Sequence, residues 1–155
     1  MSEQWEKVTR DEDETNWCIL EVEGDEVVGV ADGNGLEALK NAFEDDKIQW
    51  GIFRVAGVDS RGGLESRRSK YVQINWVGPS VTPMKKMRAL SGKEVVGAFL
   101  GSIGMAMDAR DRDDLEDVDI AKKLISAGGA HKPTYYDFGD CQVSLADLGF
   151  ADDTQ

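Results

Sequence analysis

The chain has 155 residues, of which 41% are hydrophobic, and carries four tryptophans and a formal net charge of −12. This length and hydrophobic content predict one folded domain and exclude a chain that is disordered throughout. The negative charge argues against a general nucleic-acid binder, because phosphate binding needs a wide positive surface.

The two cysteines and the first residues indicate the cellular context. Cys18 and Cys141 are too few and too far apart for a disulfide framework, and Cys18 lies in an apolar run, so we expect a reduced, buried thiol. Met1 is followed by acidic and polar residues, which is unlike a signal peptide. No window approaches the roughly 18 apolar residues that span a membrane. We therefore expect a cytoplasmic protein that does not bind membranes.

The first third of the chain predicts a helix, a β-hairpin and a second helix. Residues 3–14 indicate a short N-terminal helix, which the acidic run Asp11–Glu14 closes or follows as a loop. Alternation of apolar and polar side chains predicts strands at 17–23 and 26–31, joined by a tight turn. Apolar residues at helical spacing then predict a helix over residues 36–44.

The middle third predicts two strands and a long helix. Apolar markers place the strands at 48–58 and 70–77, with a polar connection over residues 59–65. Apolar residues recurring every three or four positions predict a helix over residues 84–102, bent at Ser91–Gly92.

The last third predicts a strand, a helix and an extension. The strand is expected at 105–109, and Asp113 is a candidate N-cap for a helix over 114–126 that Gly128–Gly129 ends. Residues 131–155 mix aromatic, turn-forming and acidic residues, which indicates a partly ordered, acidic extension. Strand pairs separated by helices predict an α+β protein with a mixed sheet covered by helices.

Residues 66–93, named here the basic stretch, interrupt the negative charge. They contain no Asp or Glu and seven basic residues, whereas the rest of the chain has 11 basic and 30 acidic residues. The seven are Arg67, Arg68, Lys70, Lys85, Lys86, Arg88 and Lys93. Such a dipole orients an acidic partner, although charge runs also occur on ordinary solvated faces.

The start of the predicted long helix concentrates this charge. Met84 and Met87 alternate there with Lys85, Lys86 and Arg88. Cations at a helix N-terminus act against the helix dipole, and such local conflicts are expected at functional sites. The two methionines indicate either an adaptable apolar contact surface or core packing.

One motif suggests a different class of function. The segment Gly33-x-Gly35-x-x-Ala38 follows a strand and opens a helix, as in the dinucleotide-binding fingerprint, with Asp59 at a suitable distance. A Gly-rich strand-to-helix turn explains it better, because the chain continues with a hairpin and not with a parallel crossover. A nucleotide-binding enzyme that uses this turn is kept as an alternative.

Other chemistry is poorly represented. The acidic run 108–119 lacks the glycine at position 6 of an EF-hand loop and is explained by the preference of acids for helix N-termini. His131 is the one histidine of the chain, so neither a catalytic triad nor a zinc site is expected. We expect no catalytic residues, no cofactor and no metal.

Several segments together resemble the coactosin group of the actin-depolymerising-factor homology (ADF/cofilin) family. They are Glu65–Tyr71, Ile74–Gly78, Lys85–Lys86 and Leu124–Ala130, with Thr15–Cys18 matching the first strand and Asp111–Glu116 the approach to the last helix. The resemblance covers about residues 5–131 and implies a mixed five- or six-stranded sheet sandwiched between helices. It implies an ADF-homology domain over residues 1–131, followed by an acidic C-terminal extension over residues 132–155.

The resemblance also implies a function and a site. Proteins similar to coactosin bind the sides of actin filaments and have little action on monomers, without severing and without enzymatic activity. We therefore expect a monomeric protein of the cytoplasmic actin cytoskeleton; a cofilin-like severing and depolymerising factor is the alternative within the family. The implied actin-binding residues are Arg67, Arg68, Lys70, Lys85, Lys86, Met87 and Arg88. Ile125 and Ser126 stand where coactosins carry lysines, and Lys122 and Lys123 lie one turn earlier.

Overall fold

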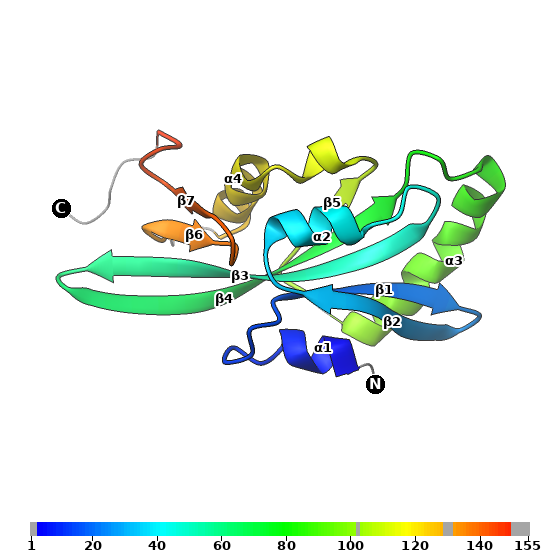
Figure 1. Cartoon of the computed structure of the whole chain (residues 1–155), viewed down its shortest axis with the longest axis horizontal. Helices are drawn as coiled ribbons and strands as arrows, with labels where there is room; N and C mark the ends of the chain where they lie inside the picture. The colour runs from blue at the N-terminus through cyan, green and yellow to red at the C-terminus, as the bar shows by residue number, and fades with distance from the viewer. Residues whose placement is uncertain (1–2, 102, 129–131, 150–155) are drawn as a thin grey trace.

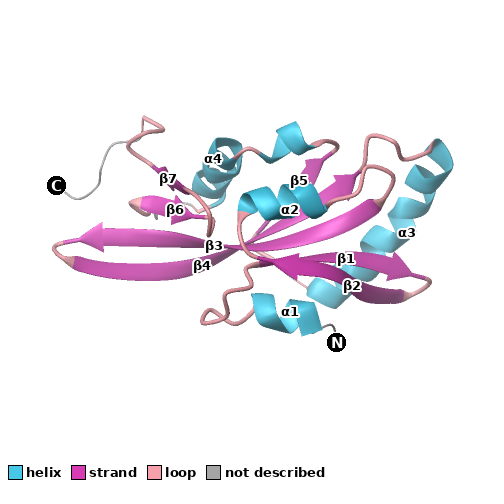
Figure 2. Ribbon diagram, in the orientation of Figure 1, coloured by secondary structure: helices cyan, strands magenta, loops and turns pink. Residues whose placement is uncertain are grey.

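The computed structural model describes residues 3–101, 103–128 and 132–149, which form one sheet with helices on both faces (Figures 1 and 2). The strands are β1 (Trp17–Glu23), β2 (Glu26–Gly33), β3 (Ile48–Arg61), β4 (Leu64–Val77), β5 (Met105–Ala109), β6 (Tyr135–Asp137) and β7 (Gln142–Ser144). The helices are α1 (Glu3–Val8), α2 (Leu36–Ala42), α3 (Pro83–Leu100) and α4 (Asp117–Ala127), with a 3-10 turn η1 (Arg112–Leu115).

The strand order is β2-β1-β3-β4-β5, with β6 paired to β3 and β7 paired to β6. β4 and β5 are parallel, whereas the other pairs are antiparallel, so the sheet is mixed. The predicted α+β class is therefore confirmed. Over the described residues the sheet has seven strands and not the predicted five or six, because the C-terminal segment contributes β6 and β7.

Two apolar clusters hold the layers together, one on each face of the sheet. On one face Trp76 of β4 packs in a cluster with Leu39 of α2 and Leu124 of α4. On the other face Trp50 of β3 packs in a cluster with Val96 of α3. Trp76 is buried, and its indole N–H donates to the carbonyl oxygen of Glu44 at 2.8 Å, which satisfies its polar atom.

The β1–β2 hairpin forms as predicted. Gly24 supplies the turn with a φ of +63°, a conformation in which glycine carries no Cβ penalty. Cys18 on β1 is buried and free, in agreement with the predicted reduced thiol. Burial raises the pKa of Cys18 to about 12, so the thiol is protonated and a poor nucleophile at neutral pH.

Helix α1 ends at Val8, and the acidic run Asp11–Glu14 lies in the loop that follows it. The buried guanidinium of Arg54 on β3 donates to the carbonyl oxygen of Val8 at 2.7 Å and to that of Asp13 at 2.6 Å. A side chain that satisfies terminal carbonyl groups replaces the bonds of a further helical turn. Arg54 therefore fixes the loop between α1 and β1 on the sheet.

Strands β3 and β4 extend far beyond their predicted limits and form a projecting hairpin (Figure 1). The predicted connection over residues 59–65 is wrong: the strands pair continuously out to Arg61 and Leu64. The turn is Gly62–Gly63, with φ values of +60° and +78°, and two positive values are typical of a type I′ hairpin turn. The exposed outer strands need no apolar alternation, which is why periodicity missed them. We name residues 56–70 the arm.

Helix α3 is continuous through Ser91–Gly92, so the helix has no interruption at the predicted bend. Gly92 has another role, since a Cβ atom there would lie 3.0 Å from the Trp50 ring. The glycine allows the helix to pass closely over this buried indole. The helix ends at Leu100, and residue 102, the predicted end, lies outside the described residues.

The predicted start of the last helix is also wrong. The N-cap of α4 is Glu116 and not Asp113. Asp113 lies in η1, where Asp111 is the N-cap and forms a capping box with Asp114. Helix α4 then begins at Asp117 and ends at Ala127, with Gly128 as its C-cap. Gly129, Ala130 and His131 lie outside the described residues.

The C-terminal segment, residues 132–149, packs on the sheet. Tyr136, Phe138, Val143 and Leu145 are buried in the same cluster as Trp76. The predicted division of the chain at residue 131 remains a prediction, but the described part of the segment shares the core of the preceding residues.

Candidate functional site

The start of α3 is set by local sequence. Pro83 occupies the first helical position, where its missing N–H costs nothing, and the Thr82 hydroxyl accepts the N–H of Lys85 at 3.3 Å. The first turn contains no acidic residue, so its cations face the positive end of the helix dipole without local compensation.

The exposure of the two methionines decides between the predicted alternatives of a contact surface and core packing. Met84 is 66% exposed and Met87 is 77% exposed, so neither packs in the core. They lie three residues apart and therefore share one face of the helix. Two exposed methionines on one helix face provide an adaptable apolar surface for a partner.

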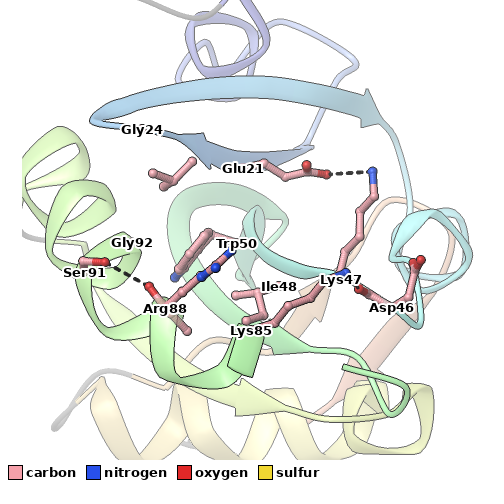
Figure 3. Close-up of a pocket in the computed structure, with 12 residues that line it drawn as sticks. Glu21, Gly24, Asp46, Lys47, Ile48, Trp50, Lys85, Arg88, Ser91 and Gly92 are labelled. Carbon is pink, nitrogen blue, oxygen red and sulfur yellow. Dashed lines mark hydrogen bonds and ion pairs between the residues drawn. The ribbon is translucent and has the colours of Figure 1, made fainter. Parts of the chain in front are cut away.

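The basic residues of α3 divide between two environments. Lys85 and Arg88 line a groove of about 530 Å³ between α3, the β1–β2 hairpin and the start of β3, with Trp50 in its wall (Figure 3). The ammonium group of Lys85 donates to the carbonyl oxygen of Asp46 at 3.2 Å. Lys86 and Met87 are exposed and lie outside this groove.

Arg67, Arg68 and Lys70 all lie on β4, which begins at Leu64 and not at the predicted residue 70. Side chains alternate between the two faces of a strand, so Arg68 and Lys70 share the face of Val72, which packs in the same cluster as α4. Arg67 points to the opposite face, the face of Tyr71. A flat partner therefore cannot contact Arg67 and Arg68 in the same way.

Arg67 already has partners within the chain. Its guanidinium donates to the carboxylate of Asp137 on β6 at 2.7 Å, and it lies 3.5 Å from Glu65. The hydrogen bond to Asp137 raises the pKa of Arg67, so the side chain stays charged. Within the described part of the chain, Arg68, Lys70, Lys86 and Arg88 have no carboxylate partner.

The structure does not bring the two groups of predicted site residues together. The tip of the arm lies at one end of the long axis of the molecule and the start of α3 at the other (Figure 1). The basic stretch thus forms two separate surfaces connected by the inner part of β4.

Sequence reasoning missed Leu64 as a site candidate, although it lies next to the arm's turn and is 79% exposed. The sequence indicates Met84 as a possible contact, but it is not among the actin-binding residues that the resemblance implies. The sequence feature that could have identified Leu64 is that it is an isolated apolar residue in a polar segment. The acidic partner of Arg67 had no sequence signal, because Asp137 lies 70 residues away.

The geometry contradicts the nucleotide-binding alternative. The strand after the glycine turn, β3, is antiparallel to β1, whereas a dinucleotide-binding unit needs a parallel crossover. The backbone N–H groups of Leu36 and Glu37, which would face a pyrophosphate, instead donate to the carboxylate of Asp140 at 2.8 and 3.0 Å. Gly35 is required for this arrangement, because it has a φ of +95° and a Cβ there would lie 2.9 Å from Asp140.

Comparison with known proteins then identifies the family. Residues 1–125 match the sequence model of the family described as cofilin/tropomyosin-type actin-binding protein. The chain belongs to this family.

Individual relatives agree with this assignment. Coactosin of Dictyostelium discoideum is 28% identical over 129 residues, covering 81% of this chain and 86% of the relative. The crystal structure of coactosin from Entamoeba histolytica superposes with a TM-score of 0.65 at 28% identity, covering 83% of this chain and 93% of the other. The drebrin-like protein of Mus musculus is 28% identical over 153 residues, and the chain spans 33% of its length.

The described helices contain no segment that is long and apolar enough to cross a bilayer. The described residues also contain no group of three or more His, Cys, Asp or Glu side chains placed to hold a metal ion.

Proposed function

We propose that this protein binds the sides of actin filaments in the cytoplasm, as a monomer with little affinity for monomeric actin and without severing or enzymatic activity. The observation that carries the proposal is the start of α3, where the exposed Met84 and Met87 lie among Lys85, Lys86 and Arg88, which have no carboxylate partner among the described residues. An apolar centre with a charged surround is the usual composition of a protein interface. Family membership and the similarity to coactosins support actin as the partner.

We assign contact with actin to both surfaces. The α3 surface consists of Lys85, Lys86, Met87 and Arg88. The arm surface consists of Arg68 and Lys70, with Arg67 on the opposite face of the same strand. Actin is acidic, so the local positive charge suits it although the whole chain is negative.

The separation of the two surfaces supports a filament as the partner. Because the arm and the start of α3 lie at opposite ends of the long axis, the two surfaces are poorly placed to contact one compact epitope together (Figure 1). A filament presents neighbouring actin subunits side by side, so each surface can contact a different subunit. Two linked contacts raise the overall affinity well above that of either contact alone.

Cosedimentation with filamentous actin tests the proposal. We expect binding at low salt that weakens as salt is added, because exposed charges are screened over about 10 Å at 0.1 M and about 3 Å at 1 M. Absence of cosedimentation at low salt would contradict the proposal.

One variant for each surface locates the contacts. Lys70→Ala is expected to weaken binding about two- to fivefold, the value of an exposed ion pair. Met87→Ser is expected to weaken it about tenfold, since burial of a methionine is worth about 1.5–3 kcal/mol. The matched controls are Arg110→Ala, an exposed cation outside both surfaces, and Val30→Ser, an apolar side chain of β2 that is 45% exposed. Equal losses in variants and controls would argue against these surfaces.

Microscopy of labelled filaments separates side binding from the cofilin-like alternative. Severing raises the number of filament ends, whereas side binding leaves it unchanged. We expect no increase at concentrations that saturate the filaments.

A further inference from the structure

The C-terminal segment is built onto the base of the arm. β6 pairs with residues 56–58 of β3, directly beyond the point where β1 stops pairing with the same edge. Thr134 adds two bonds: its N–H donates to the carbonyl oxygen of Val58 at 2.8 Å, and its hydroxyl accepts the N–H of Ser60 at 3.1 Å. The arm therefore has a third strand along its base.

This third strand is itself firmly held by the core. Phe138 is buried and packs edge-on against Phe53 at a centroid distance of 5.9 Å. Its carbonyl oxygen accepts the side-chain N–H of Asn16 at 3.0 Å. β6 is thus a fixed support and not a loosely attached tail.

Arg67 and Asp137 connect this support to the far strand of the arm. Val58 is opposite Arg67, and Ala56 is opposite Asp137, so both charged side chains lie on one face and meet diagonally across β3. One carboxylate oxygen of Asp137 accepts from the guanidinium, and the other accepts the N–H of Gly139 at 2.8 Å. The pair joins β4 to β6 over the strand between them.

We infer that Arg67 is a positioning residue: with Asp137 it holds the arm against β6, so that Arg68 and Lys70 on the other face meet actin in a fixed orientation. This inference rests on the proposed function for its consequence in binding. It assigns the C-terminal segment, which lies beyond the residues matched by the family, a part in presenting the actin-binding surface.

The direction in which a substitution of Asp137 changes filament binding distinguishes this role from direct contact between Arg67 and actin. Asp137→Asn removes a negative charge but keeps an oxygen for Gly139. If Arg67 touched actin directly, releasing it from Asp137 would leave binding to an acidic partner unchanged or stronger. If Arg67 positions the arm, Asp137→Asn weakens filament binding, and we expect a loss of about two- to fivefold.

The matched control is Glu65→Gln. This substitution also removes one negative charge near Arg67, because the carboxylate of Glu65 lies 3.5 Å from the guanidinium, but it changes no residue of β6. We expect binding by Glu65→Gln to equal that of the unmodified protein. We also expect Arg67→Ala combined with Asp137→Asn to bind no more weakly than Arg67→Ala alone, because the two side chains act as one unit.

Hydrogen exchange of residues 57–69 gives a readout that does not depend on actin. Faster exchange in Asp137→Asn, with unchanged exchange in Glu65→Gln, would show that Asp137 holds the arm against β6. This result would stand even if the unmodified protein did not cosediment with filaments and the proposed function were wrong. Unchanged exchange in Asp137→Asn, or binding as tight as that of the unmodified protein, would overturn the inference.

Discussion

Single glycines show how the backbone geometry constrains this chain. Gly78, directly after β4, packs against the chain between α2 and β3, and a Cβ atom there would lie 2.1 Å from the carbonyl oxygen of Asp45. Gly97 lies inside α3, and no atom comes within 4 Å of the position that its Cβ would take. The same substitution should therefore have opposite effects at the two positions.

We expect Gly78→Ala to destabilise the fold by about 1–3 kcal/mol, because backbone must shift to admit the methyl group. Gly97→Ala is expected to stabilise it by about 0.5–1 kcal/mol, because alanine loses less conformational freedom in a helix than glycine. Denaturant unfolding of the two variants measures both free energies. Similar stability of Gly78→Ala and the unmodified protein would show that residues 44–46 move aside easily.

At the scale of residues, the sequence predicted the charge of Arg67 and Arg68 but not the direction in which their side chains point. Arg67 and Arg68 are adjacent in the sequence and carry the same charge, yet they face opposite sides of the arm. The sequence shows alternation only if residues 64–69 are known to form a strand, and their polar composition concealed this.

At the scale of elements, α2 shows how a distant residue completes a local structure. Its N-cap position is Gly35, which has no side chain, and the free N–H groups of Leu36 and Glu37 are instead bound by Asp140. Burial raises the pKa of Asp140, but the hydrogen bonds that its carboxylate accepts, led by those from the backbone N–H groups of Glu37 and Leu36, together lower it by more. The pKa of Asp140 is therefore below its ordinary value of 3.8. The carboxylate form is therefore the one that stabilises the helix.

This cap has a defined pH dependence. A carboxyl group with a lower pKa in the folded state stabilises the fold above its unfolded pKa, and the contribution is lost as the pH falls through the folded pKa. Asp140→Ala is expected to lower the free energy of unfolding at pH 7 by about 0.5–2 kcal/mol, the usual value of a cap. The difference from the unmodified protein should shrink as the pH falls below 3.8.

Thermal unfolding over a pH series measures this effect. Asp147→Ala, an exposed acid of the same segment, is the control and should show no such convergence. A constant difference at every pH would contradict a cap that depends on charge.

At the scale of the whole molecule, the described C-terminal segment belongs to the core. Tyr136, Phe138, Val143 and Leu145 are buried among residues of the earlier elements. Burying one large apolar side chain contributes about 1.5–3 kcal/mol, and a domain is stable by about 5–15 kcal/mol. Four such side chains are therefore comparable to the whole stability.

We expect a chain that ends at residue 131 not to fold cooperatively. The control is a chain that ends at residue 149, which removes none of the described residues and should unfold like the full-length protein. Near-ultraviolet circular dichroism and denaturant unfolding distinguish the outcomes. A cooperative transition at the same midpoint in the shorter chain would instead support a domain boundary at residue 131.

The sequence by itself determined the elements whose signals are local. Local patterns located β1, β2, α2 and β5, the apolar run around Cys18 placed this thiol in the core, and the missing acids marked the basic stretch. Its motifs identified the family, and with it the fold.

The tertiary structure decided which of these residues meet. Arg67 finds Asp137 across 70 residues, and Leu36 finds Asp140 across 104. It also separated the basic stretch into two distant surfaces and turned Met84 and Met87 outward. The physical reason is that periodicity and charge act over a few neighbouring residues, whereas partners that are distant in sequence are selected by the packing of the whole sheet.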